Sequence, residues 1–218
     1  MAHTLTSPRA DVVRRGQWLT WGTILYNALE AIVSIGAGML AGSVALVGFG
    51  FDSVLELTSS VAALWRLGGD RHAHRRDVIE RRALRVIGVC FLLLAAWIAV
   101  DATRSLLARE APEESPIGIA IAAASLVVMP LLARAKRGVA RQLSSRALNA
   151  EARQTELCTI LSAILLGGLL LNALVGWWWA DSVTALAMVP LVTIEGVRAL
   201  RGEPPCGDSC GGACHTEG

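Results

Sequence analysis

The sequence predicts an all-α integral membrane protein in which a bundle of six helices crosses the bilayer. Of the 218 residues, 54% are apolar and 17% are charged, whereas about a quarter of the residues in a soluble domain are charged. The apolar residues form blocks of about 20, the length that crosses a bilayer, and basic residues gather between the blocks. With a net charge of only +2, the basic residues indicate topology and give little support to nucleic-acid binding.

Each apolar block is a predicted membrane-spanning helix. The expected spans are 17–40, 43–66, 84–107, 116–134, 153–176 and 180–198. The fourth span is the shortest, and Pro130 near its end leaves its boundary open. The expected domains are a cytoplasmic N-terminal segment (1–16), a six-helix transmembrane domain (17–200) and a flexible cytoplasmic tail (201–218). The tail is too short to be a soluble domain of its own.

The basic residues also predict how the helices are oriented in the membrane. Of the 20 Lys and Arg residues, only Arg104 and Arg109 lie at the connection between the third and fourth spans. All the others lie in the N-terminal segment, in the connections after the second and fourth spans, or at the C-terminal end. Six spans place all of these segments, including Lys136 in the connection after the fourth span, on the side of the membrane opposite to Arg104 and Arg109. Because Lys and Arg concentrate in cytoplasmic loops, we expect both termini in the cytoplasm and a multi-pass protein of the cell membrane.

Two acids stand inside the second apolar block, in the stretch VGFGFDSVLELT. Asp52 and Glu56 are four residues apart, so a helix places them on one face, one turn apart. A carboxylate at mid-bilayer costs roughly 3 kcal/mol on insertion scales, so both should face the protein interior or a water-filled cavity. A divalent cation neutralises both charges, and a shared proton neutralises one; a site that alternates between these states exchanges metal for protons. The alternative is that both acids pair with buried arginines.

The fifth block, in the stretch NAEARQTELCTILSAILL, contains residues that can complete such a site. One helical face is shared by Glu151, Gln154 or Thr155, Cys158 and Ser162. A thiolate at Cys158 is a soft metal ligand, and Gln154 offers a carbonyl oxygen, whereas Glu156 should point elsewhere. The alternative for Cys158 is that it packs as a small hydrophobic residue.

Four other polar residues are predicted to support the ligands or to relay protons. They are Asn27, Glu30, Glu151 and Asp181. Asn27 and Glu30 share a face of the first span with Ser34, and the alternative for Glu30 is hydrogen bonding to a neighbouring helix. Asp181 begins the sixth span, where capping of that helix is the expected role and metal binding is the alternative.

The C-terminal tail carries a second group of metal-binding residue types. A tail metal site would use Cys206, Asp208, Cys210, Cys214 and His215. Three thiols and a histidine can complete a tetrahedral site, and cytoplasmic thiols stay reduced. We expect this tail to capture metal; the alternative is a chemically idle tail.

Two further motifs accompany these acids. The segment GSVAL (residues 42–46) precedes the acidic block, and the sixth span reads GWWWADSVTALAMVPLVTIEGVRAL. In these features the chain resembles the cation diffusion facilitator family over about residues 17–200. The resemblance implies six helices with cytoplasmic termini, a homodimer, and export of divalent metals in exchange for protons. It also implies that helices 1, 2, 4 and 5 rock against a pair formed by helices 3 and 6.

The family resemblance assigns ligands on the second and fifth helices. The family pattern is Asp-x-x-x-Asp on the second helix, matched by Asp52 and Glu56, and His-x-x-x-Asp on the fifth. Gln154 and Cys158 stand at the latter two positions. These replacements add a thiolate and remove a hard ligand, so zinc or cadmium is expected rather than manganese or magnesium.

The sequence therefore predicts a secondary transporter that exports a divalent transition metal, zinc-like, by proton antiport. Its expected partners are the bilayer, the metal ion, protons and a second copy of the chain, with no nucleic acid. We expect no resident cofactor and no enzymatic activity, since the sequence shows no Ser/His/Asp set or metalloprotease motif. The alternative is a non-transporting membrane metal sensor, or a partner-binding protein, that acts through its Cys/His tail.

Overall fold

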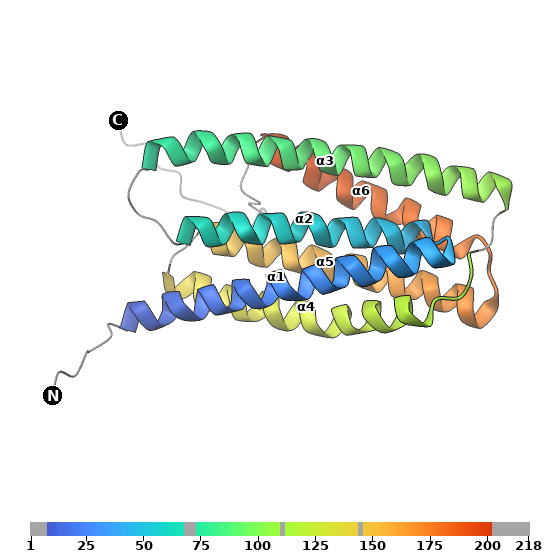
Figure 1. Cartoon of the computed structure of the whole chain (residues 1–218), viewed down its shortest axis with the longest axis horizontal. Coiled ribbons are helices and arrows are strands. Elements are labelled where there is room, and N and C mark those ends of the chain that lie inside the picture. The colour runs from blue at the N-terminus through green and yellow to red at the C-terminus, as the bar shows by residue number, and fades with distance from the viewer. Residues whose placement is uncertain (1–7, 68–72, 110–111, 144–145, 202–218) are drawn as a thin grey trace, which may run out of the picture.

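The computed structural model describes residues 8–67, 73–109, 112–143 and 146–201, and within these ranges all the regular secondary structure is α-helix. The helices are α1 (Pro8–Ala41), α2 (Val44–Leu67), α3 (Ala73–Ala108), α4 (Pro116–Leu143), α5 (Arg146–Val175) and α6 (Ala180–Arg201). Figure 1 shows them as one elongated bundle. Each contains a stretch long and apolar enough to cross a membrane. The predicted all-α, multi-pass membrane protein is thereby confirmed.

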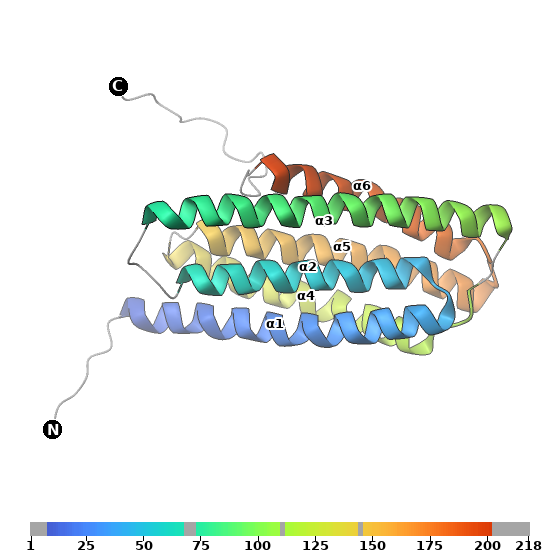
Figure 2. The ribbon, with the colours of Figure 1, turned by 45° about the horizontal axis from the view of Figure 1, so that its top comes forward.

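The six helices divide into a four-helix body and a two-helix pair. In the body, α1 and α5 each pack against both α2 and α4, so α1 and α5 face each other diagonally across a common axis. In the pair, α3 and α6 pack mainly along each other; α3 rests against α2, and α6 rests against both α5 and α2. Figure 2 shows this pair set to one side of the body. The grouping of helices agrees with the one that the family resemblance implies.

The helices α3 and α6 approach closely because glycines face each other at their contact. A Cβ atom added to Gly88 would lie 2.7 Å from the carbonyl oxygen of Gly196. One added to Gly196 would lie 3.0 Å from side-chain atoms of Leu92 and Phe91. Small residues allow such close packing in membranes, where apolar burial contributes little to helix association.

Four helices extend well beyond the spans that the sequence predicts. Helix α1 begins at Pro8, ahead of the expected start at 17, and α5 begins at Arg146, ahead of the expected start at 153. Helix α4 continues to Leu143, beyond the expected end of the span at 134, and Pro130 lies inside it. Helix α3 begins at Ala73, ahead of the expected start at 84. Helix-breaking residues are tolerated in membrane helices because neighbouring groups satisfy the freed backbone atoms. The Arg-rich segments thus extend the spans as helix, while the orientation of the bundle in the membrane stays a prediction.

The GSVAL motif forms the turn between α1 and α2. Gly42 has φ +67°, a left-handed conformation that favours glycine, and the Ser43 amide donates to the Gly38 carbonyl at 2.9 Å. This is the Schellman pattern of helix ends. The Ser43 hydroxyl then accepts a hydrogen bond from the Leu46 amide at 3.1 Å, which caps the start of α2.

Candidate metal centre

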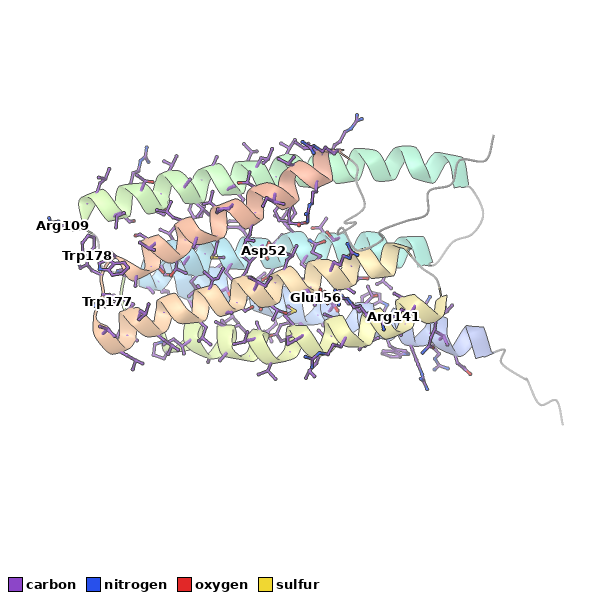
Figure 3. The ribbon with its side chains drawn as sticks, turned by 180° about the vertical axis from the view of Figure 1, so that it is seen from behind. Asp52, Arg109, Arg141, Glu156, Trp177 and Trp178 are labelled. Atoms are coloured by element: carbon purple, nitrogen blue, oxygen red, sulfur yellow. The ribbon has the colours of Figure 1, made fainter. Side chains whose placement is uncertain are left out.

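Asp52 and Glu56 are buried on α2, inside the bundle. Figure 3 shows Asp52 near the middle of the bundle's length, with Trp177 and Trp178 at one end. The exposed fraction is 8% for Asp52 and 1% for Glu56. Within the described ranges neither carboxylate forms an ion pair. The prediction that both acids face the interior is confirmed, and the alternative of pairing with buried arginines finds no support there.

The charged groups that interact with Asp52 and with the Cys158 thiol are acids. Asp52 interacts electrostatically with Glu56, Glu30 and Glu195. The Cys158 thiol on α5 is 1% exposed and interacts with Glu56, Glu30 and Asp52. All of these groups are negative when ionised, so their charges repel one another unless protons or a cation neutralise them.

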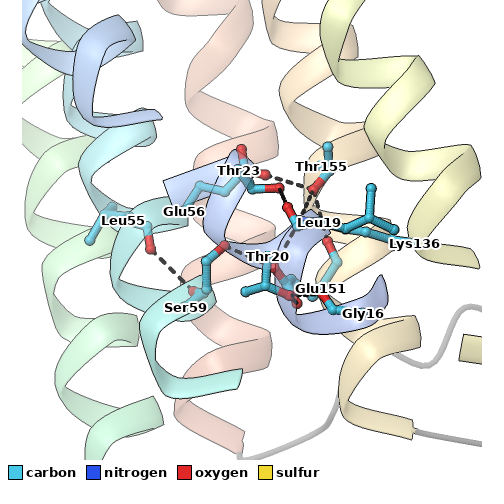
Figure 4. Close-up of polar contacts among 11 residues, drawn as sticks. Gly16, Leu19, Thr20, Thr23, Leu55, Glu56, Ser59, Lys136, Glu151 and Thr155 are labelled. Carbon is cyan, nitrogen blue, oxygen red and sulfur yellow. Dashed lines mark hydrogen bonds and ion pairs between the residues drawn. The ribbon is translucent and has the colours of Figure 1, made fainter. Parts of the chain in front are cut away.

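One oxygen of Glu56 is satisfied and the other is not. Oε1 accepts a hydrogen bond from Thr155 Oγ1 at 2.7 Å, a contact that Figure 4 shows between α2 and α5. Oε2 is buried and has no hydrogen-bond partner. Buried polar atoms in folded proteins are almost always paired, so an unpaired carboxylate oxygen is an exception. A bound cation would supply the missing partner.

A buried lysine stands close to this group, and sequence reasoning missed it. Lys136 on α4 is fully buried, and its Nζ lies 2.8 Å from Glu151 Oε1. The same ammonium donates to Thr155 Oγ1 at 3.1 Å. Glu151 also accepts hydrogen bonds from Ser60 at 3.0 Å and from Thr20 at 3.4 Å. Figure 4 shows how these contacts join four helices of the body.

The assignment of Lys136 to a connecting segment is therefore wrong. The segment ARAKRG contains three basic residues, a pattern typical of a loop at the membrane surface. Helix α4 continues through it, so helical spacing places Lys136 on the same face as the buried Met129 and Ala133. That spacing was the signal in the sequence that could have identified it.

On α5 the structure distinguishes between Thr155 and Gln154. Thr155 is fully buried and contacts Glu56, whereas Gln154 is half-buried and makes no hydrogen bond within the described part of the chain. The contacts give Gln154 no support as a ligand, so that role stays a prediction. Glu156 forms an ion pair with Arg137 and is partly exposed, which confirms that it points elsewhere.

On α1 the structure separates Glu30 from Asn27. Glu30 is fully buried, and its carboxylate accepts hydrogen bonds from Ser53 Oγ at 2.8 Å and from the Ser125 hydroxyl. Ser125 also bonds to the Tyr26 hydroxyl at 2.8 Å. Glu30 thus follows the alternative reading, hydrogen bonding to neighbouring helices. Asn27 is fully buried, and neither its Oδ1 nor its Nδ2 has a partner.

Asp181 caps α2, and its expected role as the cap of the sixth helix is wrong. Its carboxylate accepts hydrogen bonds from Ser43 Oγ at 2.5 Å, from the Val44 amide at 3.0 Å and from the Ala45 amide at 3.4 Å. A carboxylate at a helix N-terminus satisfies unpaired amides and complements the helix dipole. The contact depends on tertiary packing, which local sequence does not reveal. It lies at the end of α2, away from Asp52.

The acids and the thiol surround the bundle axis without forming a closed cage. Among the residues that the structure describes, no three His, Cys, Asp or Glu side chains converge closely enough to hold a metal ion by themselves. A cation bound here would need a further donor or a small movement of the helices. The tail residues Cys206, Asp208, Cys210, Cys214 and His215 lie outside the described residues.

Comparison with known proteins identifies the family of this helical unit. Residues 21–202 match the family of the cation efflux transmembrane domain. The chain is 26% identical to transmembrane protein 163 of Xenopus laevis over 86% of its own length and 66% of that protein. It is 25% identical to an uncharacterized transporter of Synechocystis sp., covering 78% of this chain and 56% of the relative. For an uncharacterized transporter of Methanocaldococcus jannaschii the identity is 23%, over 78% of this chain and 62% of the relative. The chain thus spans less than two thirds of each of these relatives.

Proposed function

The chain belongs to the cation efflux family, and from that premise we propose that it is a secondary transporter that exports a divalent transition metal. The observation that carries the proposal is the pair of buried acids, Asp52 and Glu56, in the middle of a membrane-spanning helix without an ion pair in the described ranges. Acids inside membrane spans are costly and mark ion pathways or proton relays. A cation that binds between them removes that cost.

The proposed cargo is zinc or a similar thiophilic ion such as cadmium. The donors near the axis combine carboxylate oxygens with the Cys158 thiol. Zinc accepts both oxygen and thiolate ligands, whereas magnesium and manganese prefer oxygen alone. The thiol therefore favours zinc and cadmium over the harder ions.

The proposed driving force is an inward flow of protons. Once the metal has left, several carboxylates remain close together in an apolar setting, where their repulsion favours proton uptake. A proton taken up from one side and released on the other would return the site to its metal-binding state. Proton antiport therefore follows from the same crowding of acids that binds the metal.

Transport of single ions into proteoliposomes tests this proposal. We expect Zn²⁺ and Cd²⁺ uptake with a matching pH change inside the vesicles, and little uptake of Mn²⁺ or Mg²⁺. Asp52→Ala and Glu56→Ala should abolish uptake, whereas Glu156→Gln, which alters a surface ion pair, should leave it unchanged. Wild-type uptake in the Asp52→Ala, Glu56→Ala double variant would refute the proposal.

We further propose that the transporter works as a homodimer. Mass measurement of the protein in lipid nanodiscs can test this proposal.

The proteoliposome uptake assay also distinguishes a transporter from the alternative, a membrane metal sensor. A sensor would bind metal without moving it across the bilayer. Its function would be lost on truncation of the Cys/His tail and would survive substitution of Asp52.

A further inference from the structure

We propose that α1 supplies a ligand to the transport site, namely the amide oxygen of Asn27. The metal would bind on the axis of the four-helix body between Asn27, Glu56 and Cys158, with Asp52 one helical turn away. This inference rests on the proposed transport function and adds a residue from a third helix to the acids of α2 and the thiol of α5.

The first observation is that Asn27 is buried without a hydrogen bond. Its exposed fraction is 0%, and both Oδ1 and Nδ2 lack a partner. An amide left unpaired in an apolar interior is unfavourable, because it has lost its hydrogen bonds to water without replacing them. The described structure holds few such atoms, and Glu56 Oε2 is another of them. If these two unsatisfied oxygens lie close together, a single cation can bind both.

The register of α1 against α2 places these two oxygens at the same level. The helices run antiparallel, and Glu30 bonds to Ser53 across their contact at 2.8 Å. Moving three residues back along α1 leads to Asn27, and moving three residues forward along α2 leads to Glu56. Residues three apart lie on neighbouring parts of one helical face. Asn27 and Glu56 therefore stand opposite each other.

The register of α1 against α5 independently places Cys158 at that level. These helices run in the same direction and face each other diagonally across the axis. Thr20 contacts Glu151 across that diagonal at 3.4 Å. Asn27 lies seven residues after Thr20, and Cys158 lies seven residues after Glu151, so both are two turns further along. Both are fully or almost fully buried, so they approach the axis from opposite sides.

The donor chemistry fits a zinc-like ion. An amide oxygen, a carboxylate oxygen and a thiolate give two oxygen donors and one sulfur donor around the ion, and Asp52 or water can supply the fourth. Because one of its donors is an asparagine, this site does not require three His, Cys, Asp or Glu side chains to converge. Binding would also satisfy both unpaired oxygens. In this arrangement Asn27 takes the place that the sequence reading gave to Gln154.

Zinc binding to the full-length chain in nanodiscs tests the proposal. The background carries Cys206→Ser, Cys210→Ser and Cys214→Ser, so that tail thiols do not add to the signal. We expect Asn27→Leu to weaken Zn²⁺ affinity at least tenfold and Asn27→Asp, which keeps an oxygen donor, to preserve it. Ser34→Ala is the matched control, since Ser34 is another buried, unpartnered group on the same face of α1 but two turns from Asn27. It should bind Zn²⁺ like the parent.

Melting temperature separates a ligand from a structural amide. If Asn27 binds the metal and has no partner in its absence, the Asn27→Leu variant should have a melting temperature no lower than that of the parent without zinc. Its melting temperature should rise less than that of the parent when zinc is added. A structural amide would instead lower the melting temperature with and without zinc equally. In that case the proposal is wrong.

Two results distinguish this proposal from the proposed function. If the parent binds no divalent metal, and Asp52→Ala changes nothing, the transport function itself fails. If the parent binds Zn²⁺ and Asp52→Ala loses it, but Asn27→Leu binds as tightly as the parent, only the role of Asn27 fails. A thiolate-to-Co²⁺ charge-transfer band that Asn27→Leu shifts and Ser34→Ala leaves unchanged would support Asn27 as a neighbour of Cys158 on the ion.

Discussion

Two groups of buried acids in the four-helix body differ in how their charge is compensated. Glu151 pairs with the ammonium of Lys136 and accepts hydrogen bonds from two hydroxyls. Glu56 and Asp52 lie one and two turns along α2 from Ser60, which bonds to Glu151. Neither has an ion pair in the described part of the chain, and Glu56 Oε2 has no hydrogen bond. Thr155 joins the two groups, because it bonds to both Lys136 and Glu56.

The presence or absence of an internal cation distinguishes a structural acid from an acid that can bind a ligand. A buried ion pair is complete in itself, and removing one partner leaves an uncompensated charge. An acid without an internal cation depends on something from outside, either a proton or a metal ion. The sequence alone does not separate these cases, since Glu151, Glu56 and Asp52 are all acids in apolar helices. The distinction arises from one lysine on a neighbouring helix.

Removing the lysine should have the largest effect on stability. Lys136→Met leaves Glu151 buried and unpaired, which should lower the free energy of unfolding by about 3–5 kcal/mol. The double variant Lys136→Met, Glu151→Gln should recover most of that loss, because no lone charge remains. Unfolding in mixed micelles measures both variants. Equal stability of Lys136→Met and the parent would show that the pair contributes nothing.

Neutralising an unpaired acid should affect transport rather than folding. Asp52→Asn keeps the shape of the side chain but removes its charge, so we expect metal affinity to fall about 100-fold, equivalent to about 2.7 kcal/mol. The unfolding free energy of the metal-free protein should stay unchanged or rise. Isothermal titration with Zn²⁺ and thermal unfolding without metal give the two values. A large loss of stability without metal would place Asp52 with the structural acids.

Replacing the thiol should change which metal is preferred. Cys158→Ser removes the soft donor, so cadmium affinity should fall relative to manganese affinity by about tenfold, or about 1.4 kcal/mol. Competition titrations with the two ions measure this ratio. An unchanged ratio would mean that Cys158 only packs in the core.

The smallest effect is expected at the surface. Arg137 and Glu156 form an ion pair in which both side chains are more than a third exposed, and such pairs contribute about 0–1 kcal/mol. Glu156→Gln should therefore leave unfolding and metal uptake near parental values, and increasing salt should remove the remaining difference. Loss of uptake in this variant would instead indicate that Glu156 takes part in transport.

The features that sequence predicted well are those that local spacing determines. Six spans follow from hydropathy, and the burial of Asp52 and Glu56 follows from their position within an apolar helix. Cys158 was a candidate ligand because helical spacing puts it on one face with Glu151 and Ser162. Each of these inferences uses only residues within a few turns of one another.

The features that sequence missed depend on contacts between helices. Lys136 lies in a basic run, and only the continuation of α4 against α5 makes it buried. Thr155 and Gln154 both fit the expected face, and packing selects Thr155. Asp181 is at the start of α6 but bonds to the start of α2. In each case the partner lies on another helix, and spacing within one helix cannot identify that partner, although it could have shown that Lys136 shares a face with apolar residues.

The Asp181 contact holds the start of α6 to the start of α2. Three hydrogen bonds join the first turn of α6 to the start of α2, so a tilt between these helices has its fulcrum there. Glu195 lies roughly 21 Å along α6 from that point at about 1.5 Å per residue, so a tilt of about 10° displaces it by about 4 Å. That displacement is comparable to the width of a water molecule. Because Glu195 is one of the acids that interact with Asp52, such a tilt would move Glu195 relative to the buried acid while the start of α6 stayed in place.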